Sequence, residues 1–153
     1  MTRAGSKPLN FEALAEFRYA IRRYLNFSER NARKAGLEPQ QYQALLAIKG
    51  LEPLPSATIG VLAERLQIQH HSAVELMDRL ERRGMIRRHR NQSDRRKVIV
   101  ELTKRGETKL KKVSLPHRDE LQSAGRRLLR ALETFISHDG ARATMRQRGK
   151  SAR

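Results

Sequence analysis

The sequence predicts a mainly α-helical fold with a small β-hairpin wing, arranged as a winged helix-turn-helix with further helices at both ends. Three observations predict this class. Apolar residues recur at helical spacing along most of the chain. Two short helical segments, residues 58–66 and 70–83, are separated by a tight connection. A polar turn over residues 91–94 then lies between two extended segments, as in a β-hairpin.

The first two helices are predicted from their end signals. Residues 10–35 form a long helix, because Asn10 is a typical N-cap and Gly36 a typical residue just beyond a helix end. A second helix spans residues 39–49, since its first residue is a proline and a glycine follows its last. The side chains expected to face inward from this second helix are Tyr42, Leu45 and Leu46.

Residues 58–83 are predicted to form the helix-turn-helix. Thr58 caps a short helix with an apolar face at helical spacing. Residues 67–69 form the turn, and the next helix runs over residues 70–83 until Gly84 closes it. Its inward side chains are expected to be Val74, Met77 and Leu80.

Residues 85–102 follow as a two-stranded ribbon, called the wing below. The second strand, residues 97–102, is rich in β-branched residues, and the first spans residues 85–90. Because the connecting tip is polar and basic, we expect it to stand clear of the core. The apolar residues expected to anchor the ribbon are Ile86, Val98, Val100 and Leu102.

A last long helix is predicted from Thr103, which caps it. Pro116 is expected to bend this helix without ending it, and Gly125 is a candidate for a second break. The apolar stripe continues to about His138. Residues 139–153 contain no large apolar residue except a single methionine and are expected to form a basic, flexible tail.

Positive charge dominates the composition. The 153 residues include 33 Lys or Arg and 16 Asp or Glu, a formal net charge of +17. Residues 79–97 hold nine of the cations, eight of them arginine, against two acids. Guanidinium groups suit phosphate oxygens and guanine edges, whereas a membrane-surface segment would need large apolar residues on an opposing face. The charge favours nucleic acid as the partner over a membrane, although such runs are also found on merely solvated faces.

Several function classes lack their sequence signals. There is no cysteine, which excludes disulfides and thiol chemistry, and no apolar run long enough to span a bilayer or to act as a secretory signal. A cytoplasmic location is therefore expected. His70 and His71 point in different directions on a helix and have no further ligands at helical spacing, so we expect no metal site. No nucleotide-binding or hydrolase motif occurs, so neither a cofactor nor enzyme activity is expected.

The helix-turn-helix and the wing together predict contact with duplex DNA. The second helix of such a motif enters the major groove with its first residues toward the base edges. A basic wing tip suits the minor groove, where narrow stretches attract arginine. Reading helix and wing are contiguous in this sequence, which strengthens the prediction.

Four segments carry a family resemblance. They are Ile-Gly-Val-Leu-Ala-Glu-Arg-Leu at 59–66, Leu-Met-Asp-Arg-Leu-Glu-Arg-Arg-Gly-Met-Ile at 76–86, Ser-Asp-Arg-Arg at 93–96 and Leu-Thr-Lys-Arg-Gly at 102–106. In this order they resemble the MarR family of winged-helix transcriptional regulators. The resemblance extends over about residues 10–138, and its most specific part is the Asp-Arg-Arg tip followed by a strand and Leu-Thr-x-x-Gly.

Residue roles follow from chemistry and from the positions that match the family. Arg95 or Arg96 is expected to enter the minor groove, Arg95 slightly ahead, with Asp94 paired to one of them. Arg79 is expected on a phosphate, Glu75 on a cytosine, and Ser72 on a phosphate or base. The full set of predicted DNA-binding residues is Gln69, His70, His71, Ser72, Glu75, Arg79, Asp94, Arg95 and Arg96.

Two positions depart from the family pattern. Gln67 occupies a turn position where the family often has glycine, so the tightness of that turn is open. The paired histidines at the start of the reading helix are unusual, so the preferred DNA sequence cannot be transferred from relatives.

The resemblance also implies a homodimer, in which the first and last helices of two subunits interlock and present two reading heads to a pseudo-palindromic site. Apolar stripes on the terminal helices support this independently, because the winged core cannot cover them. The resulting division is residues 1–36 and 103–138 for dimerisation, 37–102 for DNA binding and 139–153 for the tail.

A small aromatic or phenolic effector is the third partner that the resemblance implies. Its binding residues would be Tyr19, Arg23, Phe27 and Tyr42, although ordinary core packing explains the aromatic residues equally well and is the preferred interpretation. The predicted function is a sequence-specific, double-stranded DNA-binding transcriptional regulator, expected to be a repressor. The alternative is an architectural protein that binds nucleic acid without choosing its sequence.

Overall fold

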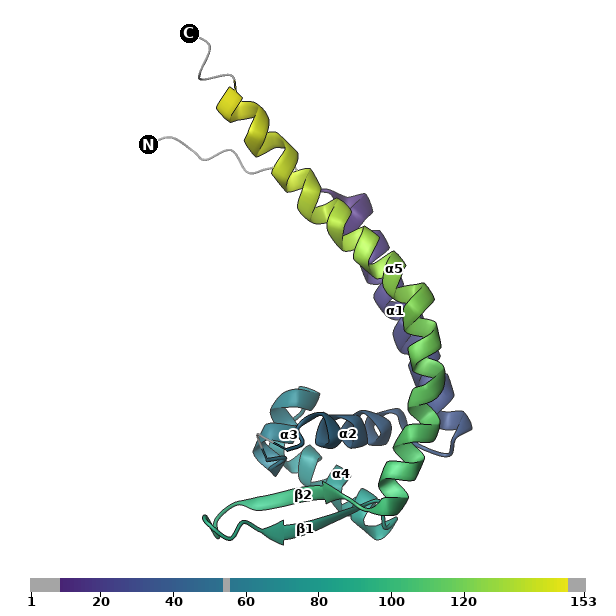
Figure 1. Ribbon diagram of the computed structural model, residues 1–153, viewed down its shortest axis with the longest axis vertical. Helices are drawn as coiled ribbons and strands as arrows, with labels where there is room; N and C mark the ends of the chain where they lie inside the picture. Colours follow the sequence, from purple (N-terminus) through teal and green to yellow (C-terminus); the bar gives the residue numbers. More distant parts are fainter. Residues whose placement is uncertain (1–8, 54–55, 149–153) are drawn as a thin grey trace. The chain divides into compact units, whose positions relative to one another are not determined.

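A computed structural model of the chain describes residues 9–53 and 56–148, with side chains described as far as residue 136. The order of elements is α1 (Phe11–Lys34), α2 (Pro39–Gly50), α3 (Ile59–Leu66), α4 (His70–Arg82), β1 (Ile86–Arg90), β2 (Val98–Leu102) and α5 (Lys104–Arg148) (Figure 1). The predicted class, mainly helical with one hairpin, is confirmed.

The elements group into two compact units, which are described separately. Ser28–His117 form one unit, called the winged unit, which holds α2, α3, α4 and the hairpin. Residues up to Phe27 and from Arg118 onward form the other, called the helical unit. The winged unit contains the helix-turn-helix and the wing, so it contains the reading surface predicted from the sequence.

The helix ends follow local capping signals. The Asn10 side chain accepts a hydrogen bond from the Ala13 backbone N–H at 3.0 Å, and Thr58 accepts one from Val61 at 3.4 Å. Gly36 and Gly84 both take positive φ, 76° and 66°, just beyond helix ends. These local signals explain why the predicted boundaries of α1 to α4 are correct to within about two residues.

The core of the winged unit joins all of its elements. Among its fully buried side chains are Leu45, Leu62, Met77, Leu80 and Met85. The two strands pair antiparallel, from Ile86 opposite Leu102 to Arg90 opposite Val98. The backbone N–H of Val100 also donates to the Ala57 carbonyl at 2.8 Å, which ties the hairpin to the segment before α3.

Two apolar positions were predicted wrongly as inward. Leu46 is 47% exposed because α2 buries Tyr42, Ala44, Leu45 and Ile48, and Leu46 lies on the opposite face of that helix. Val98 is 37% exposed because it belongs to the last pair of the hairpin ladder, beyond the reach of the core. Ile86, Val100 and Leu102 do anchor the hairpin, at 2%, 2% and 8% exposure.

The last helix is longer than predicted. It continues through Pro116, as expected, and through Gly125, where the suggested break does not occur. One glycine costs a helix only about 1 kcal/mol, which flanking turns of good helix formers outweigh. The helix also runs to Arg148, so the predicted end near His138 is too early; residues 149–153 of the expected tail lie outside the described residues.

Candidate nucleic-acid interface

The turn between α3 and α4 is tight although it contains no glycine. Gln67 takes the left-handed conformation, with φ 54° and ψ 44°. Its side-chain amide donates to the Glu64 carbonyl at 2.7 Å, and the Ile68 backbone N–H donates to the Ala63 carbonyl at 3.0 Å. These bonds complete a helix C-cap and offset the steric cost of a side chain at this φ.

The first turns of α4 present polar side chains to solvent. Gln69, His70, His71, Glu75 and Arg79 are exposed, and Ser72 is partly exposed. Within the described part of the chain none of these side chains has a hydrogen-bond or ion-pair partner. The opposite face of α4 is buried through Ala73, Leu76, Met77 and Leu80, whereas Val74 is only partly buried. The predicted contact residues at the start of α4 and along it are therefore outside its buried face.

Asn91 and Asp94 organise the wing tip. The Asn91 side-chain oxygen accepts from the Ser93 N–H at 2.8 Å and from the Ser93 hydroxyl at 2.6 Å. Asp94 accepts from the Arg96 backbone N–H at 3.1 Å, and its other oxygen lies 3.9 Å from the Lys97 ammonium. Asp94 therefore pairs with Arg96 through the backbone N–H of that residue, and its ion pair is with Lys97. Arg95 and Arg96 are exposed.

The arginine-rich run over residues 79–97 separates into two groups. Arg83 donates to the Gln41 side chain at 2.6 Å and to the Gly36 carbonyl at 2.8 Å. Arg87 pairs with Glu101 across the hairpin at 2.9 Å, and Arg88 reaches Asp78 and Glu81 on α4. The remaining arginines have no ion pair among the described residues and are exposed: Arg79, Arg82, Arg90, Arg95 and Arg96.

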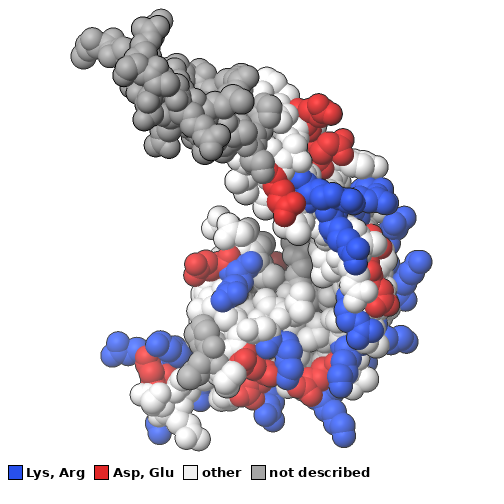
Figure 2. Space-filling view, turned by 45° about the horizontal axis from the view of Figure 1, so that its top comes forward, with Lys and Arg blue, Asp and Glu red and all other residues white. Residues whose placement is uncertain are grey.

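The pKa of Arg88 agrees with this division into paired and unpaired arginines. The hydrogen bond to Glu81, and after it the bond to Asp78, raise the pKa of Arg88. On the face shown in Figure 2, red acidic side chains lie among the blue Lys and Arg side chains of the described residues. Within residues 79–97, the exposed arginines without an ion pair lie on the wing and on the exposed face of α4.

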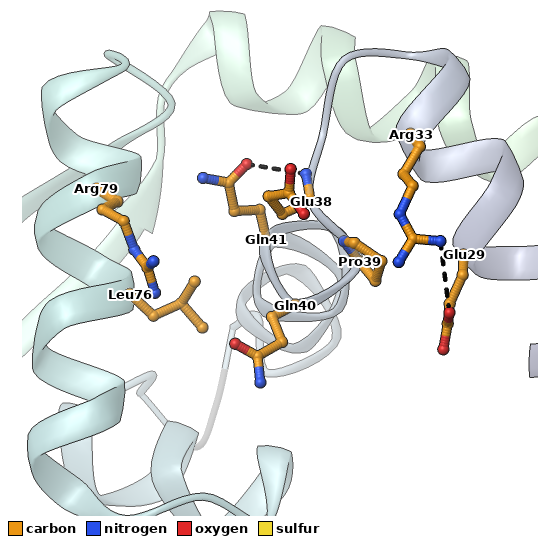
Figure 3. Close-up of a pocket in the computed structure, with 8 residues that line it drawn as sticks. All are labelled: Glu29, Arg33, Glu38, Pro39, Gln40, Gln41, Leu76 and Arg79. Carbon is orange, nitrogen blue, oxygen red and sulfur yellow. Dashed lines mark hydrogen bonds and ion pairs between the residues drawn. The ribbon is translucent and has the colours of Figure 1, made fainter.

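Arg79 borders a hollow of about 410 Å³ between the end of α1, the start of α2 and α4 (Figure 3). Glu29 and Arg33 form an ion pair of 3.6 Å at its rim, and Gln41 accepts from the Glu38 backbone N–H at 3.1 Å. Its lining mixes acids, amides and cations. The hollow therefore does not by itself indicate one class of ligand.

The four predicted effector residues fall in different units. Tyr19, Arg23 and Phe27 belong to the helical unit, where the Arg23 guanidinium lies 5.8 Å from the centre of the Tyr19 ring. Tyr42 belongs to the winged unit and is only 4% exposed. Burial raises the pKa of Tyr42, whose hydroxyl lies 3.4 Å from Ser114 Oγ. Tyr42 is thus a core residue, while an effector role for the four residues stays a prediction.

His117 is a buried residue whose importance the sequence did not reveal. Its ring stacks on Tyr42 with centroids 4.7 Å apart, Nε2 lies 2.8 Å from Ser28 Oγ, and Nδ1 lies 2.7 Å from the Val113 carbonyl. The only signal was its position one helical turn after Val113 on the buried face of α5. His117 joins α1, α2 and α5 within the winged unit.

Comparison with known proteins agrees with this arrangement. Residues 35–97 match the sequence model of the MarR family. A curated relative, the HTH-type transcriptional repressor MdtR of Bacillus subtilis, is 31% identical over 80 residues. The sequence of this part of the chain is thus similar to the MarR family. The match to MdtR covers 52% of this chain and 50% of the relative, so the chain spans about half the length of that protein.

Solved structures of MarR-family proteins share the fold. A mutant of S. aureus MepR bound to an oligodeoxyribonucleotide is 16% identical, with a TM-score of 0.60 over 95% of this chain and 100% of that one. A mutant MarR from E. coli complexed with operator DNA is 20% identical, with a TM-score of 0.63 over 79% and 88%. At these identities the likeness concerns the fold.

The described residues lack two features that spanning a membrane and binding a metal would require. No helix in the described residues combines the length and the apolar character needed to cross a membrane. Within the same residues, His, Asp and Glu side chains do not gather in groups of three or more that could hold a metal ion.

Proposed function

We propose that this chain is a MarR-family transcriptional regulator that binds double-stranded DNA sequence-specifically, as a homodimer on a pseudo-palindromic operator. One observation carries the proposal: the winged unit leaves the first turns of α4 and the wing-tip arginines exposed and without partners, although arginines nearby are bound within the chain. Free donors on a helix and on a hairpin tip are what major-groove and minor-groove contacts require.

The residue roles within the proposal follow from side-chain chemistry. Gln69, His70 and His71 offer donors and acceptors to base edges, and Glu75 offers an acceptor to cytosine. Arg79 and Ser72 suit phosphate oxygens. Arg95 and Arg96 suit the minor groove, and Asp94 holds the turn between the strands.

The homodimer rests on the helical unit. Leu121, Leu129 and Ile136 of α5 are 47%, 56% and 59% exposed, and Phe11 of α1 is 71% exposed. Apolar side chains of this size gathered on one pair of helices indicate an interface with another chain. A second copy is the natural partner, because a twofold-symmetric protein matches a palindromic site. Residues 1–36 and 103–138 would serve dimerisation and residues 37–102 DNA binding.

The test compares two duplexes of equal length at physiological salt: a palindrome selected from a random pool and a scrambled version of it. Specific binding exceeds non-specific binding by at least about a thousandfold for a sequence-specific regulator. An architectural protein, the alternative that the +17 charge supports, would bind both duplexes alike and lose affinity steeply with salt. Equal affinities would therefore refute the proposed function.

The wing is tested with Arg95→Ala combined with Arg96→Ala. We expect the affinity for the palindrome to fall at least about tenfold, because two minor-groove contacts are lost. Arg18→Ala combined with Arg22→Ala is the matched control, since it removes the same charge from exposed positions of α1. Similar losses of affinity in both double variants would contradict a specific role of the wing and indicate a general effect of charge.

The proposal also includes repression of transcription and release of the regulator from DNA by a small aromatic or phenolic anion. Arg23 beside the Tyr19 ring offers a cation and an aromatic face in the helical unit. Such an effector must bind the DNA-incompetent conformation more tightly than the competent one, since equal affinity shifts nothing. A phenolic carboxylate should weaken DNA binding by the unaltered chain and not by Arg23→Ala. Loss of DNA binding at the same concentrations in both proteins would point to a non-specific effect.

A further inference from the structure

Two arginines that are adjacent in β1 have opposite surroundings. Arg87 lies on the outer face of the strand, where its side chain is 71% exposed and pairs with Glu101 of β2. Arg88 lies on the face shared with the buried Ile86, and its side chain is 28% exposed. Successive residues of a strand point to opposite faces, so the two neighbours perform different tasks.

Arg88 is bound to the reading helix through four contacts. Its Nη2 donates to Asp78 Oδ1 at 2.8 Å and also contacts Glu81 Oε2. Its Nε donates to Glu81 Oε2 at 2.9 Å, and its backbone N–H donates to Glu81 Oε1 at 3.2 Å. Asp78 and Glu81 are one turn apart on α4, so a single planar guanidinium spans one turn of that helix.

This arrangement leaves few donors of Arg88 free to contact DNA. We infer that Arg88 is a positioning residue. Together with Asp78 and Glu81 it forms a clamp that fixes the orientation of the wing relative to α4, so that both contact one DNA site. The inference deepens the proposed function and rests on it. The Arg87 pair lies within the hairpin and cannot perform this task, since both of its partners move with the wing.

The geometry of the hairpin explains why such a clamp matters. Each strand has five residues and spans about 17 Å, so a rotation of roughly 10° at the base moves the tip by about 3 Å. Contact geometry in a binding site tolerates only about 0.5 Å. Strand β2 is held separately, by the bond from Val100 to the Ala57 carbonyl before α3. The clamp supplies the corresponding link between β1 and α4.

The clamp is not required for folding. Ile86, Val100 and Leu102 are buried at the base of the hairpin, so we expect them to anchor it without the Arg88 side chain. Partly exposed ion pairs contribute little to stability, and the side chains of Asp78 and Glu81 are 39% and 37% exposed. A variant without the clamp should therefore fold while its wing loses a defined orientation.

The experiment compares Arg88→Met with Arg87→Met on the palindromic and the scrambled duplex. Both variants remove one cation from β1, and methionine keeps the stem without donating. Arg88→Met takes the arginine partner from Asp78 and Glu81, and Arg87→Met takes it from Glu101. We expect equal affinities of the two variants for the scrambled duplex, within about twofold, because non-specific binding follows charge. For the palindrome, Arg88→Met should bind at least about tenfold more weakly than Arg87→Met, the size of losing one base contact.

A second variant separates positioning from charge. Asp78→Ala combined with Glu81→Ala removes two negative charges, so it should bind the scrambled duplex more tightly than the unaltered chain does. If the clamp positions the wing, the same variant should bind the palindrome more weakly, and hydrogen exchange of the hairpin amides should speed up without DNA. A purely electrostatic role predicts tighter binding to both duplexes and unchanged exchange.

The outcomes distinguish this inference from the proposed function. Equal binding of the unaltered chain to both duplexes refutes the proposed function, and the clamp with it. A preference for the palindrome that Arg88→Met and Arg87→Met reduce to the same extent refutes the clamp alone. Tighter binding of the double acid variant to both duplexes also refutes the clamp.

Discussion

The winged unit and the helical unit bury their apolar side chains to very different extents. In the winged unit, leucine, isoleucine, methionine or valine side chains from α2, α3, α4, both strands and the start of α5 are at most 8% exposed. In the described part of the helical unit, Ala13 and Ala20 are the buried apolar residues, and both are small. The large apolar residues of that unit that are exposed are Leu9, Phe11, Leu14, Tyr19, Leu25, Leu121, Leu129, Leu132 and Ile136.

The difference shows which part of the chain buries its apolar side chains without another chain. Burial of apolar area is the main favourable term in folding, and the winged unit obtains it within one chain. The helical unit obtains less of this term within one chain, because most of its large apolar side chains are exposed, and the proposed dimer interface would cover them. Three comparisons of substitutions, from the largest expected effect to the smallest, test this contrast.

The first comparison concerns the core of the winged unit. Leu80→Ala should lower the free energy of unfolding by about 2–5 kcal/mol, because Leu80 is fully buried and its truncation leaves a cavity. Leu46→Ala is the matched control, since Leu46 is 47% exposed in the same unit, and it should cost less than about 1 kcal/mol. Urea unfolding measures both. A similar cost at the two sites would mean that the winged unit has no distinct core.

The second comparison concerns the helical unit. Leu129→Glu combined with Ile136→Glu should raise the dimer dissociation constant at least about a hundredfold, because two buried carboxylates would face an apolar interface. Sedimentation equilibrium measures it. Leu46→Glu, which adds charge at an exposed apolar position of the winged unit, should leave the dissociation constant unchanged. A dimer that tolerates both substitutions in α5 would contradict the proposed interface.

The third comparison uses two glycines of α5. A Cβ at Gly106 would lie 2.0 Å from the Met85 carbonyl oxygen, so Gly106→Ala must displace backbone where the hairpin joins the helix. We expect a loss of about 1–3 kcal/mol in the free energy of unfolding.

Gly125 in the helical unit provides the control for this substitution. A Cβ there meets no described atom within 4 Å, and Gly125→Ala should stabilise the helix by about 0.5–1 kcal/mol. Thermal melts at matched protein concentration measure both variants. Destabilisation by the two substitutions alike would show that Gly125 is also closely packed, for instance against a partner subunit.

The helices and the hairpin were predictable because their signals are local. Asn10, Thr58 and the glycines at 36 and 84 act on backbone groups within a few residues of themselves. The order of strand, polar turn and strand likewise needs only neighbouring residues. The exposed face of α4 was predictable in the same way, since helical periodicity places its polar and apolar residues on opposite sides.

The roles of the arginines were not predictable in this way. Arg83 bonds to Gln41, which is 42 residues earlier in the chain, and Arg88 reaches across to α4, whereas Arg95 has no such partner. All three lie in one basic run, and composition cannot distinguish them. The exposure of Leu46 and the stacking of His117 on Tyr42 depend in the same way on how separate elements pack.

Local sequence thus sufficed for the elements, their order and the exposed face of α4, because hydrogen bonds within a turn or a cap depend on adjacent residues. Packing in three dimensions assigned each cation either to the protein or to a ligand. An arginine next to two carboxylates of α4 is neutralised before DNA arrives, and one at the tip of the hairpin is not. Such pairing is decided by distance in space, which linear spacing does not encode.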